Sequence, residues 1–234
     1  MLRNIEFLTT VAETHALPPP HGTEVAFVGR SNAGKSSAIN ALTQRKRMAF
    51  VSKTPGRTQH INFFRVAPGR YLVDLPGYGY AAVPVQEKAR WNQLVGDYLR
   101  GRSSLRGVVL IMDIRHPLRE LDLQLLEWIR PAGTEVHVLL TKADKLGNQQ
   151  AAATLRDVES RLREYYPGCS VQLFSSPRKI GLAEAAKKLG QWLQADKNKG
   201  PRLKGSKTGG EALSLIKAPA QGGEAGDDET PSVK

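Results

Sequence analysis

Cysteine is nearly absent from this chain of 234 residues, in which Cys169 is the only one. A single cysteine cannot form an internal disulfide, and it excludes a zinc site built on several cysteines. We expect Cys169 to be buried as a small apolar residue. The scarcity of cysteine also fits a reducing compartment.

Long apolar runs and targeting signals are absent as well. No stretch approaches the about 20 consecutive apolar residues of a membrane-spanning helix. The apolar residues near the start are interrupted by Glu6 and are too few for the core of a signal peptide. The chain begins Met-Leu and ends Thr-Pro-Ser-Val-Lys, so it has neither a myristoylation nor a prenylation motif. We therefore expect a cytoplasmic monomer without membrane contacts, which disfavours a membrane-anchored signalling switch.

Acidic residues are few beside basic ones, with 22 Asp and Glu against 34 Lys and Arg and a net charge of +12. Residues 196–234 hold seven basic and six acidic residues, so residues 1–195 carry +11 of this excess. Such a charge favours a polyanionic partner, most simply RNA, although it also serves solubility alone. Two basic groups are candidate RNA contacts, or else solvated helix ends: Arg45, Lys46 and Arg47, and Arg100, Arg102 and Arg106.

Apolar strand-like segments alternate with helical segments along the chain. The predicted strands cover residues 25–28, 61–66, 71–75, 108–114, 136–141 and 171–174, with residues 4–11 as a candidate short leading strand. The predicted helices cover residues 35–44, 85–100, 118–129, 149–165 and 182–194. This alternation predicts a three-layer α/β fold with helices on both faces of a mostly parallel, six-stranded sheet. The short turn at residues 67–70 predicts a hairpin that supplies one antiparallel edge strand.

Composition divides the chain into three parts. Residues 1–22 form an N-terminal extension with the candidate strand, and residues 23–195 form the folded domain. From residue 196 on, Gly, Lys, Ser, Pro and Ala dominate and aromatic residues vanish. Such a tail cannot bury enough apolar surface to offset its ordering entropy, so residues 196–234 are predicted to be disordered.

A phosphate-binding loop is the most specific motif. It matches G-x-x-x-x-G-K-[ST], follows a predicted strand and opens a predicted helix. The expected nucleotide contacts of this segment are Gly29, Arg30, Ser31, Asn32, Ala33, Gly34, Lys35, Ser36 and Ser37. Glycines let backbone N–H groups turn toward phosphate oxygens, and the helix N-terminus adds positive potential. Lys35 is expected to reach the β- and γ-phosphates, and the Ser36 hydroxyl to ligate Mg²⁺.

A second motif predicts a sensor of the γ-phosphate. Asp74, Leu75, Pro76 and Gly77 close a predicted strand. Asp74 is expected to hold Mg²⁺ through water. The Gly77 N–H can approach the γ-phosphate because no side chain is in the way.

A loop between these two motifs, residues 52–59, is rich in hydroxyls, Gly and Pro. This composition suits a segment that is ordered only when Mg²⁺ and a γ-phosphate are present. One of its threonines should complete the Mg²⁺ shell. On chemistry alone, both Thr54 and Thr58 qualify.

A base-reading motif, Thr141, Lys142, Ala143 and Asp144, follows another predicted strand. The Asp144 carboxylate can accept from N1–H and the 2-amino group of guanine, whereas adenine has an acceptor at N1 and no 2-amino group. The stem of Lys142 can lie along the base plane.

A weaker signal follows the next strand. Backbone N–H groups of Phe174, Ser175 and Ser176 are expected near the guanine O6. The order of all these motifs predicts GTP and GDP as ligands and the Ras-like fold of P-loop GTPases.

The motif segments together resemble the EngB (YihA/YsxC) family of bacterial ribosome-biogenesis GTPases. The resemblance covers residues 4–195 and rests on residues 24–37, 54–64, 74–81, 113–118, 141–145 and 174–176. It implies GTP hydrolysis during assembly of the large (50S) ribosomal subunit, with that subunit, its rRNA or its proteins as partners, and a link to cell division and septation. It also implies nucleotide contacts at Gly56, Arg57 and Thr58, and it selects Thr58 as the Mg²⁺ ligand. Pro177 departs from the family pattern, and the tail lies outside it.

Catalysis of phosphoryl transfer requires a positioned water and neutralised charge. The residues assigned to it are Lys35, Thr58, Gly77 and, as a hypothesis, Asn32. Many GTPases place Gln directly after Asp-x-x-Gly, but Tyr78 stands here, which predicts slow intrinsic hydrolysis. Related GTPases with an Asn at the position of Asn32 use K⁺ as a fixed positive charge, so K⁺ is a second candidate cofactor. The alternative is that Asn32 only stabilises the loop by hydrogen bonding.

Two other functions compete with a ribosome-assembly GTPase. One is a nucleotide-gated RNA-binding module with little hydrolysis, which multiple-turnover phosphate release would distinguish. The other is a tRNA-modification GTPase, which is disfavoured because it would need further catalytic domains.

Overall fold

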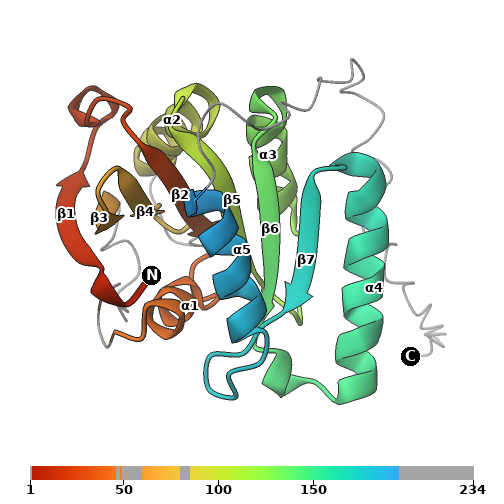
Figure 1. Cartoon of the computed structure of the whole chain (residues 1–234). Coiled ribbons are helices and arrows are strands. Elements are labelled where there is room, and N and C mark those ends of the chain that lie inside the picture. The colour runs from red at the N-terminus through yellow and green to blue at the C-terminus, as the bar shows by residue number, and fades with distance from the viewer. Residues whose placement is uncertain (1, 46–47, 49–59, 80–84, 195–234) are drawn as a thin grey trace, which may run out of the picture.

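The computed structural model describes residues 2–45, 48, 60–79 and 85–194. Its strands are β1 (Glu6–Val11), β2 (Thr23–Gly29), β3 (Ile61–Ala67), β4 (Arg70–Asp74), β5 (Leu105–Asp113), β6 (Glu135–Thr141) and β7 (Cys169–Leu173). They form one sheet in the order β1-β3-β4-β2-β5-β6-β7 (Figure 1). The strands from β4 to β7 in this order are parallel, and β3 is antiparallel to both of its neighbours.

The number of strands differs from the prediction. We expected six strands with the hairpin strand at the edge, but β1 pairs with β3 on the outside, so the sheet has seven strands and β3 is an inner strand. The candidate leading strand finds contacts there, since the Phe7 ring packs edge-on at 5.9 Å from Phe64. Arg65 of β3 also pairs with Glu6 at 2.8 Å. The predicted fold class, a mostly parallel sheet between helices, is confirmed.

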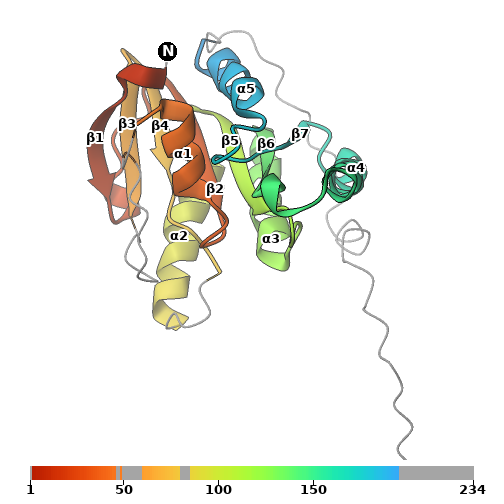
Figure 2. The same cartoon turned by 90° about the horizontal axis from the view of Figure 1, so that it is seen from below.

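Helices cover both faces of the sheet. They are α1 (Lys35–Thr43), α2 (Val85–Gly101), α3 (Glu120–Ile129), α4 (Asn148–Tyr165) and α5 (Leu182–Gln194), with short 3-10 turns at Leu2–Asn4, Thr14–Ala16, Arg130–Ala132 and Ala143–Lys145. α1 and α5 pack on one face and α2, α3 and α4 on the other (Figure 2). None of the helices in the described part of the chain has the length and hydropathy of a membrane span.

The central strands are buried on both faces, which explains their uninterrupted apolar runs. In β5, Val108 and Leu110 contribute to the core beneath α2 and α3, while Val109 and Ile111 contribute to the core beneath α1 and α5. Because such strands need helices on both sides, the layered arrangement follows from their composition.

A buried ion pair corrects one predicted RNA contact. Arg102 lies with only 6% of its side chain exposed and pairs with Glu24, which is 1% exposed, at 2.6 Å. Tyr98 and Ser104 donate two further hydrogen bonds to the same carboxylate, at 2.8 and 2.7 Å. Arg102 is therefore a structural residue, because its guanidinium neutralises a carboxylate that would otherwise be costly to bury.

Most of the other predicted RNA contacts either form ion pairs nearer the surface or lie outside the described residues. Arg106 pairs with Glu135 at 3.1 Å, and Arg100 pairs with Asp97 at 3.3 Å while remaining largely exposed. Lys46 and Arg47 lie outside the described residues, as does the tail predicted to be disordered, 196–234.

Cys169 is half-buried at the start of β7. Burial raises the pKa of its thiol to about 12, so the thiol is protonated at neutral pH, as expected for a structural rather than a reactive cysteine.

Candidate functional site

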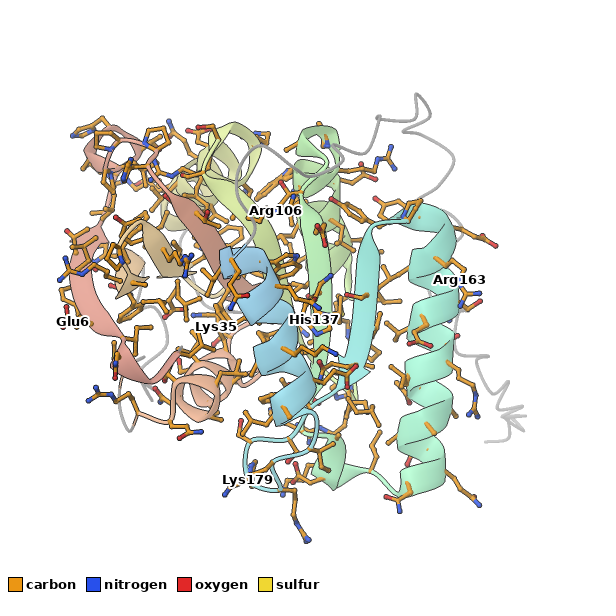
Figure 3. The ribbon with its side chains drawn as sticks, in the orientation of Figure 1. Glu6, Lys35, Arg106, His137, Arg163 and Lys179 are labelled. Carbon is orange, nitrogen blue, oxygen red and sulfur yellow. The ribbon has the colours of Figure 1, made fainter. Side chains whose placement is uncertain are left out.

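The predicted phosphate loop joins β2 to α1 at the carboxyl end of the sheet, where ligands bind in open α/β folds. Gly34, the residue before α1, has a φ of 101°, a backbone conformation that only glycine adopts without strain. A β-carbon at Gly29 would lie 2.6 Å from the carbonyl oxygen of Ile111, so glycine is required there for close packing as well. The loop that carries Lys179 and the side chain of Arg106 lie at opposite ends of the sheet (Figure 3).

Lys35 connects the phosphate loop to the second motif. Its ammonium group donates to the Asp74 carboxylate at the end of β4, and the two side chains are 10% and 5% exposed. This pairing places the two predicted phosphate and Mg²⁺ residues side by side. Ser36 follows Lys35 in the first turn of α1. The Ser36 hydroxyl and the Asp74 carboxylate are hard oxygen donors, so the residues present fit Mg²⁺.

Gly77 faces the phosphate loop. A β-carbon there would lie 3.4 Å from the Gly29 carbonyl oxygen and 3.5 Å from the Ser31 nitrogen. The next residue, Tyr78, makes two backbone hydrogen bonds to the phosphate loop. Its N–H donates to Gly29 O at 3.3 Å, and its carbonyl oxygen accepts from the Ser31 N–H at 2.7 Å. The Ser31 amide is therefore already engaged within the protein.

The side chain of Tyr78 lies in the core of the protein. It is 3% exposed, and its hydroxyl donates to the Asp122 carboxylate in α3. Burial, together with the nearby Asp122 charge, raises the pKa of Tyr78 well above its ordinary value. A neutral, buried phenol engaged with α3 is not a group that orients water, which agrees with the interpretation of Tyr78 from the sequence.

The base-reading motif is bonded directly to the phosphate loop. The Thr141 hydroxyl donates to Ala33 O, and the Lys142 ammonium donates to Asn32 O at 2.7 Å. Lys142 has a φ of 58°, an uncommon backbone conformation for a non-glycine residue. Motifs separated by 108 and 110 residues in the sequence are thus joined into one site.

A carboxylate that the motifs did not predict holds Lys142 from the other side. Asp113, at the end of β5, pairs with the Lys142 ammonium at 2.8 Å and receives two hydrogen bonds from the Arg115 guanidinium, at 2.9 and 2.6 Å. Although partial burial alone would raise the pKa of Asp113, the hydrogen bonds from Arg115 and Lys142 outweigh it and hold that pKa well below its ordinary value. The sequence signals were an acidic residue at the carboxyl end of a buried strand and the place of Asp113 in segment 113–118 of the family resemblance, and neither gave it a role.

Asp144 is oriented by the loop that follows β7. The Ser175 hydroxyl donates to Asp144 Oδ1, and this bond holds the pKa of Asp144 below its ordinary value. Asp144 is therefore an ionised, acceptor-only group at neutral pH, as recognition of guanine requires. We predicted a backbone role for Ser175, and its side-chain role was missed.

Hydrogen bonds within the loop after β7 reduce the number of backbone amides that can donate to the guanine O6. The Phe174 N–H donates to Leu140 O at 2.9 Å, and the Ser175 N–H donates to Ile180 O at 3.1 Å. Both groups are engaged within the protein. Of the three predicted amides, Ser176 is the one without an acceptor in the described part of the chain.

Several predicted residues lie outside the described residues. They are Thr54, Gly56, Arg57 and Thr58. Their nucleotide and Mg²⁺ contacts stay predictions.

Comparison with known proteins supports the identification of these motifs as those of a GTPase. A family model described as 50S ribosome-binding GTPase matches residues 24–142, about half of the chain. This range begins in β2 and reaches Lys142, so it contains the phosphate loop, the Asp74–Gly77 motif and the start of the base-reading motif.

Curated relatives match over most of their length. A probable GTP-binding protein EngB of Nitrosomonas europaea is 51% identical over 222 residues, which cover 95% of this chain and 98% of that protein. The protein of the same name in Aromatoleum aromaticum is 56% identical over 193 residues, covering 82% and 89%. That of Neisseria gonorrhoeae is 54% identical over 197 residues, covering 83% and 94%.

Solved structures support the fold. A crystal structure of a probable GTP-binding protein engB superimposes with a TM-score of 0.58 at 18% identity, covering 74% of this chain and 99% of that one. A variant of Era from Aquifex aeolicus, bound to GDP and aluminium fluoride, has a TM-score of 0.58 at 19% identity, covering 79% and 61%. With these likenesses, the assembled motifs and the extent of shared sequence, the chain is a P-loop GTPase and belongs to the EngB family of GTP-binding proteins.

Proposed function

We propose that this GTPase acts in the cytoplasm as a switch in assembly of the large (50S) ribosomal subunit, and that cell division and septation depend on it through the supply of ribosomes. The observation that carries the proposal is the match to a family described as 50S ribosome-binding GTPase, over the residues that build the site. The net charge of +11 in residues 1–195 supports rRNA as a direct contact, because basic surfaces attract the phosphate backbone.

We infer the following roles within a domain spanning residues 23–195, with residues 1–22 as an extension that adds β1. The phosphates of GTP or GDP would lie against the phosphate loop, residues 29–37, and Lys35 would exchange Asp74 for the β- and γ-phosphates. The Gly77 N–H would donate to the γ-phosphate. When bound, Mg²⁺ supplies positive charge to the phosphate oxygens, and Ser36, Thr58 and, through water, Asp74 would hold it.

The base would be read at the other end of the site. The Asp144 carboxylate would accept from N1–H and the 2-amino group of guanine, with its orientation set by Ser175. The Lys142 stem would cover the base while its ammonium stays bonded to Asn32 O and Asp113. Ser176 would supply the amide for O6.

Hydrolysis is expected to be slow without a partner, because the buried Tyr78 replaces the water-orienting amide of other GTPases. The same observation also favours a second candidate function, a nucleotide-gated RNA-binding module that hydrolyses little GTP. Multiple-turnover release of phosphate, measured with and without ribosomal subunits, separates the two. Turnover that the large subunit does not accelerate would favour the second.

Co-sedimentation tests the ribosomal partner. Purified protein is mixed with separated large and small subunits in GDP, GTP or a non-hydrolysable GTP analogue. The proposal predicts co-sedimentation with the large subunit that is strongest in the analogue. Equal binding to both subunits, or binding that ignores the nucleotide, contradicts it.

A further inference from the structure

The peptide group between Pro76 and Gly77 has two polar ends that face different partners. Its N–H is the group assigned above to the γ-phosphate. Its carbonyl oxygen accepts a hydrogen bond from the indole N–H of Trp91 in α2, at 3.0 Å. All described peptides are trans, and in a trans peptide the C=O and N–H point in opposite directions. The indole of Trp91 therefore determines where the Gly77 N–H points.

In the described part of the chain, the peptide between Pro76 and Gly77 has no backbone-to-backbone hydrogen bond of its own, unlike the flanking residues Leu75 and Tyr78. On one side the Leu75 N–H donates to Phe27 O at 2.9 Å, and on the other the Tyr78 N–H and C=O both bond the phosphate loop. The proline ring fixes the φ of Pro76, so the ψ of Pro76 and the φ of Gly77 remain, and glycine allows a wide range of φ. A correlated change in these two angles would turn the Gly77 N–H away from the phosphate loop. The bond from Trp91 opposes that rotation.

Trp91 is itself held in place by aromatic neighbours. Its ring lies 5.6 Å from Tyr78 and 6.0 Å from Trp128 of α3, measured between ring centroids. The Tyr78 hydroxyl is fixed by Asp122 in α3. The indole N–H is thus presented from a packed cluster that spans α2 and α3, rather than from a mobile surface side chain.

We propose that Trp91 is a positioning residue, which holds the Pro76–Gly77 peptide with its N–H aimed at the γ-phosphate position. The inference rests on the proposed role of Gly77. It extends that role, because α2 then senses whether the γ-phosphate is present: any rotation of the peptide breaks or remakes a bond to this helix. GDP has no γ-phosphate, so Trp91 should matter for GTP and not for GDP.

The test is equilibrium binding of GDP and of a non-hydrolysable GTP analogue to Trp91→Phe. Phenylalanine keeps an aromatic ring in the cluster and removes the N–H. Because one neutral hydrogen bond is lost, affinity for the analogue should fall roughly three- to tenfold, while affinity for GDP stays within about twofold. Trp128→Phe is the matched control, since it alters the same aromatic cluster and not the bond to Pro76. It should change neither affinity.

The inference is overturned if Trp91→Phe leaves the analogue-to-GDP ratio unchanged, or if Trp128→Phe shifts the ratio equally. Should Trp91→Phe lose its far-ultraviolet circular dichroism, 3-benzothienylalanine at position 91 removes only the N–H, and the same two outcomes apply. Failure of the proposed function looks different. In that case wild-type protein shows no preference for GTP over ATP, and the inference about Trp91 falls with it.

Discussion

At the scale of single residues, Lys142 is where the parts of the site converge. Its ammonium bonds Asn32 O at 2.7 Å and Asp113 at 2.8 Å, and its backbone is held at a φ of 58°. Neither partner lies near it in the sequence, so Asp113 controls the base-reading motif from a different strand.

Asp113→Asn should therefore weaken binding of GDP and GTP by a similar factor, roughly tenfold, because a charge-assisted hydrogen bond to Lys142 is lost and both nucleotides carry the same base. Titration with fluorescent GDP and a fluorescent GTP analogue measures this. Asp157→Asn, which removes an exposed pair with Arg161 on α4, should bind like wild type. A loss confined to GTP would contradict the assignment of Asp113 to the base.

Asn32 combines a backbone role with a candidate ion-binding role. Its φ is 62° and its carbonyl receives Lys142, so substitution by alanine would disturb the loop as well as remove the side chain. Asn32→Gly tolerates the same φ and removes the side-chain carboxamide with its oxygen. If K⁺ supplies the fixed positive charge, wild type should hydrolyse GTP faster in KCl than in NaCl, and Asn32→Gly should lose this difference while binding GDP normally. Equal wild-type rates in the two salts would end the hypothesis.

Much of the candidate site could be predicted from the sequence at this scale, since contiguous motifs named Lys35, Asp74, Gly77 and Asp144. What was missed lies in contacts between distant residues. Ser175 reaches Asp144 across 31 residues, and Trp91 reaches Pro76 across 15. No motif predicts the side-chain role of Ser175 or any role for Trp91, so only the folded arrangement shows them.

At the scale of elements, the packing of α5 on the sheet depends on a glycine in β5. A β-carbon at Gly107 would lie 2.5 Å from the indole of Trp192 in α5. Trp192 is also held by a 3.0 Å hydrogen bond to Glu135 in β6, so it has little freedom to move aside.

Gly107→Ala should therefore destabilise the protein by about 1–3 kcal/mol through overpacking. Gly190, within α5, is the matched control because a β-carbon there meets nothing within 4 Å. Gly190→Ala should stabilise by about 0.5–1 kcal/mol, since alanine loses less entropy in a helix. Urea unfolding followed by circular dichroism measures both. Changes of the same sign would refute this picture of α5 docking.

Prediction of the elements succeeded where burial imposes a clear pattern. The helix bounds agree within two residues, and the central strands were identified by their apolar runs. The edge strand β1 was predicted less well. β1 leaves Phe7 and Leu8 exposed, and its partner β3 begins only at Ile61, so neither alternation nor a hairpin turn fixed its place in the sheet.

At the scale of the whole molecule, the excess of positive charge should govern how the protein associates with the large ribosomal subunit. A net charge of +11 over residues 1–195 predicts that binding to the large subunit weakens steeply as salt rises. If six or more phosphates are contacted, affinity should fall by about 10³-fold or more between 50 and 200 mM salt. Binding that is insensitive to salt would assign the contact to ribosomal proteins instead. The surface responsible could not be predicted from charge alone, as the burial of Arg102 shows.

The layered architecture and the class of ligand followed from the sequence, because buried strands and phosphate loops have strong local patterns. The nucleotide pocket itself depends on motifs from β2, β4, β6 and β7 meeting at one end of the sheet. In the proposed function its specificity depends on one oriented carboxylate, Asp144.

Competition binding of GTP, ATP and XTP to wild type and Asp144→Asn is the most direct test. Wild type should prefer GTP over ATP by about 10³-fold or more, because adenine would leave the carboxylate without donors. Asp144→Asn should lose the preference for GTP and gain affinity for XTP, whose 2-carbonyl can accept from the new amide. Equal binding of ATP and GTP by wild type, or unchanged nucleotide choice in Asp144→Asn, would contradict the identification of this site.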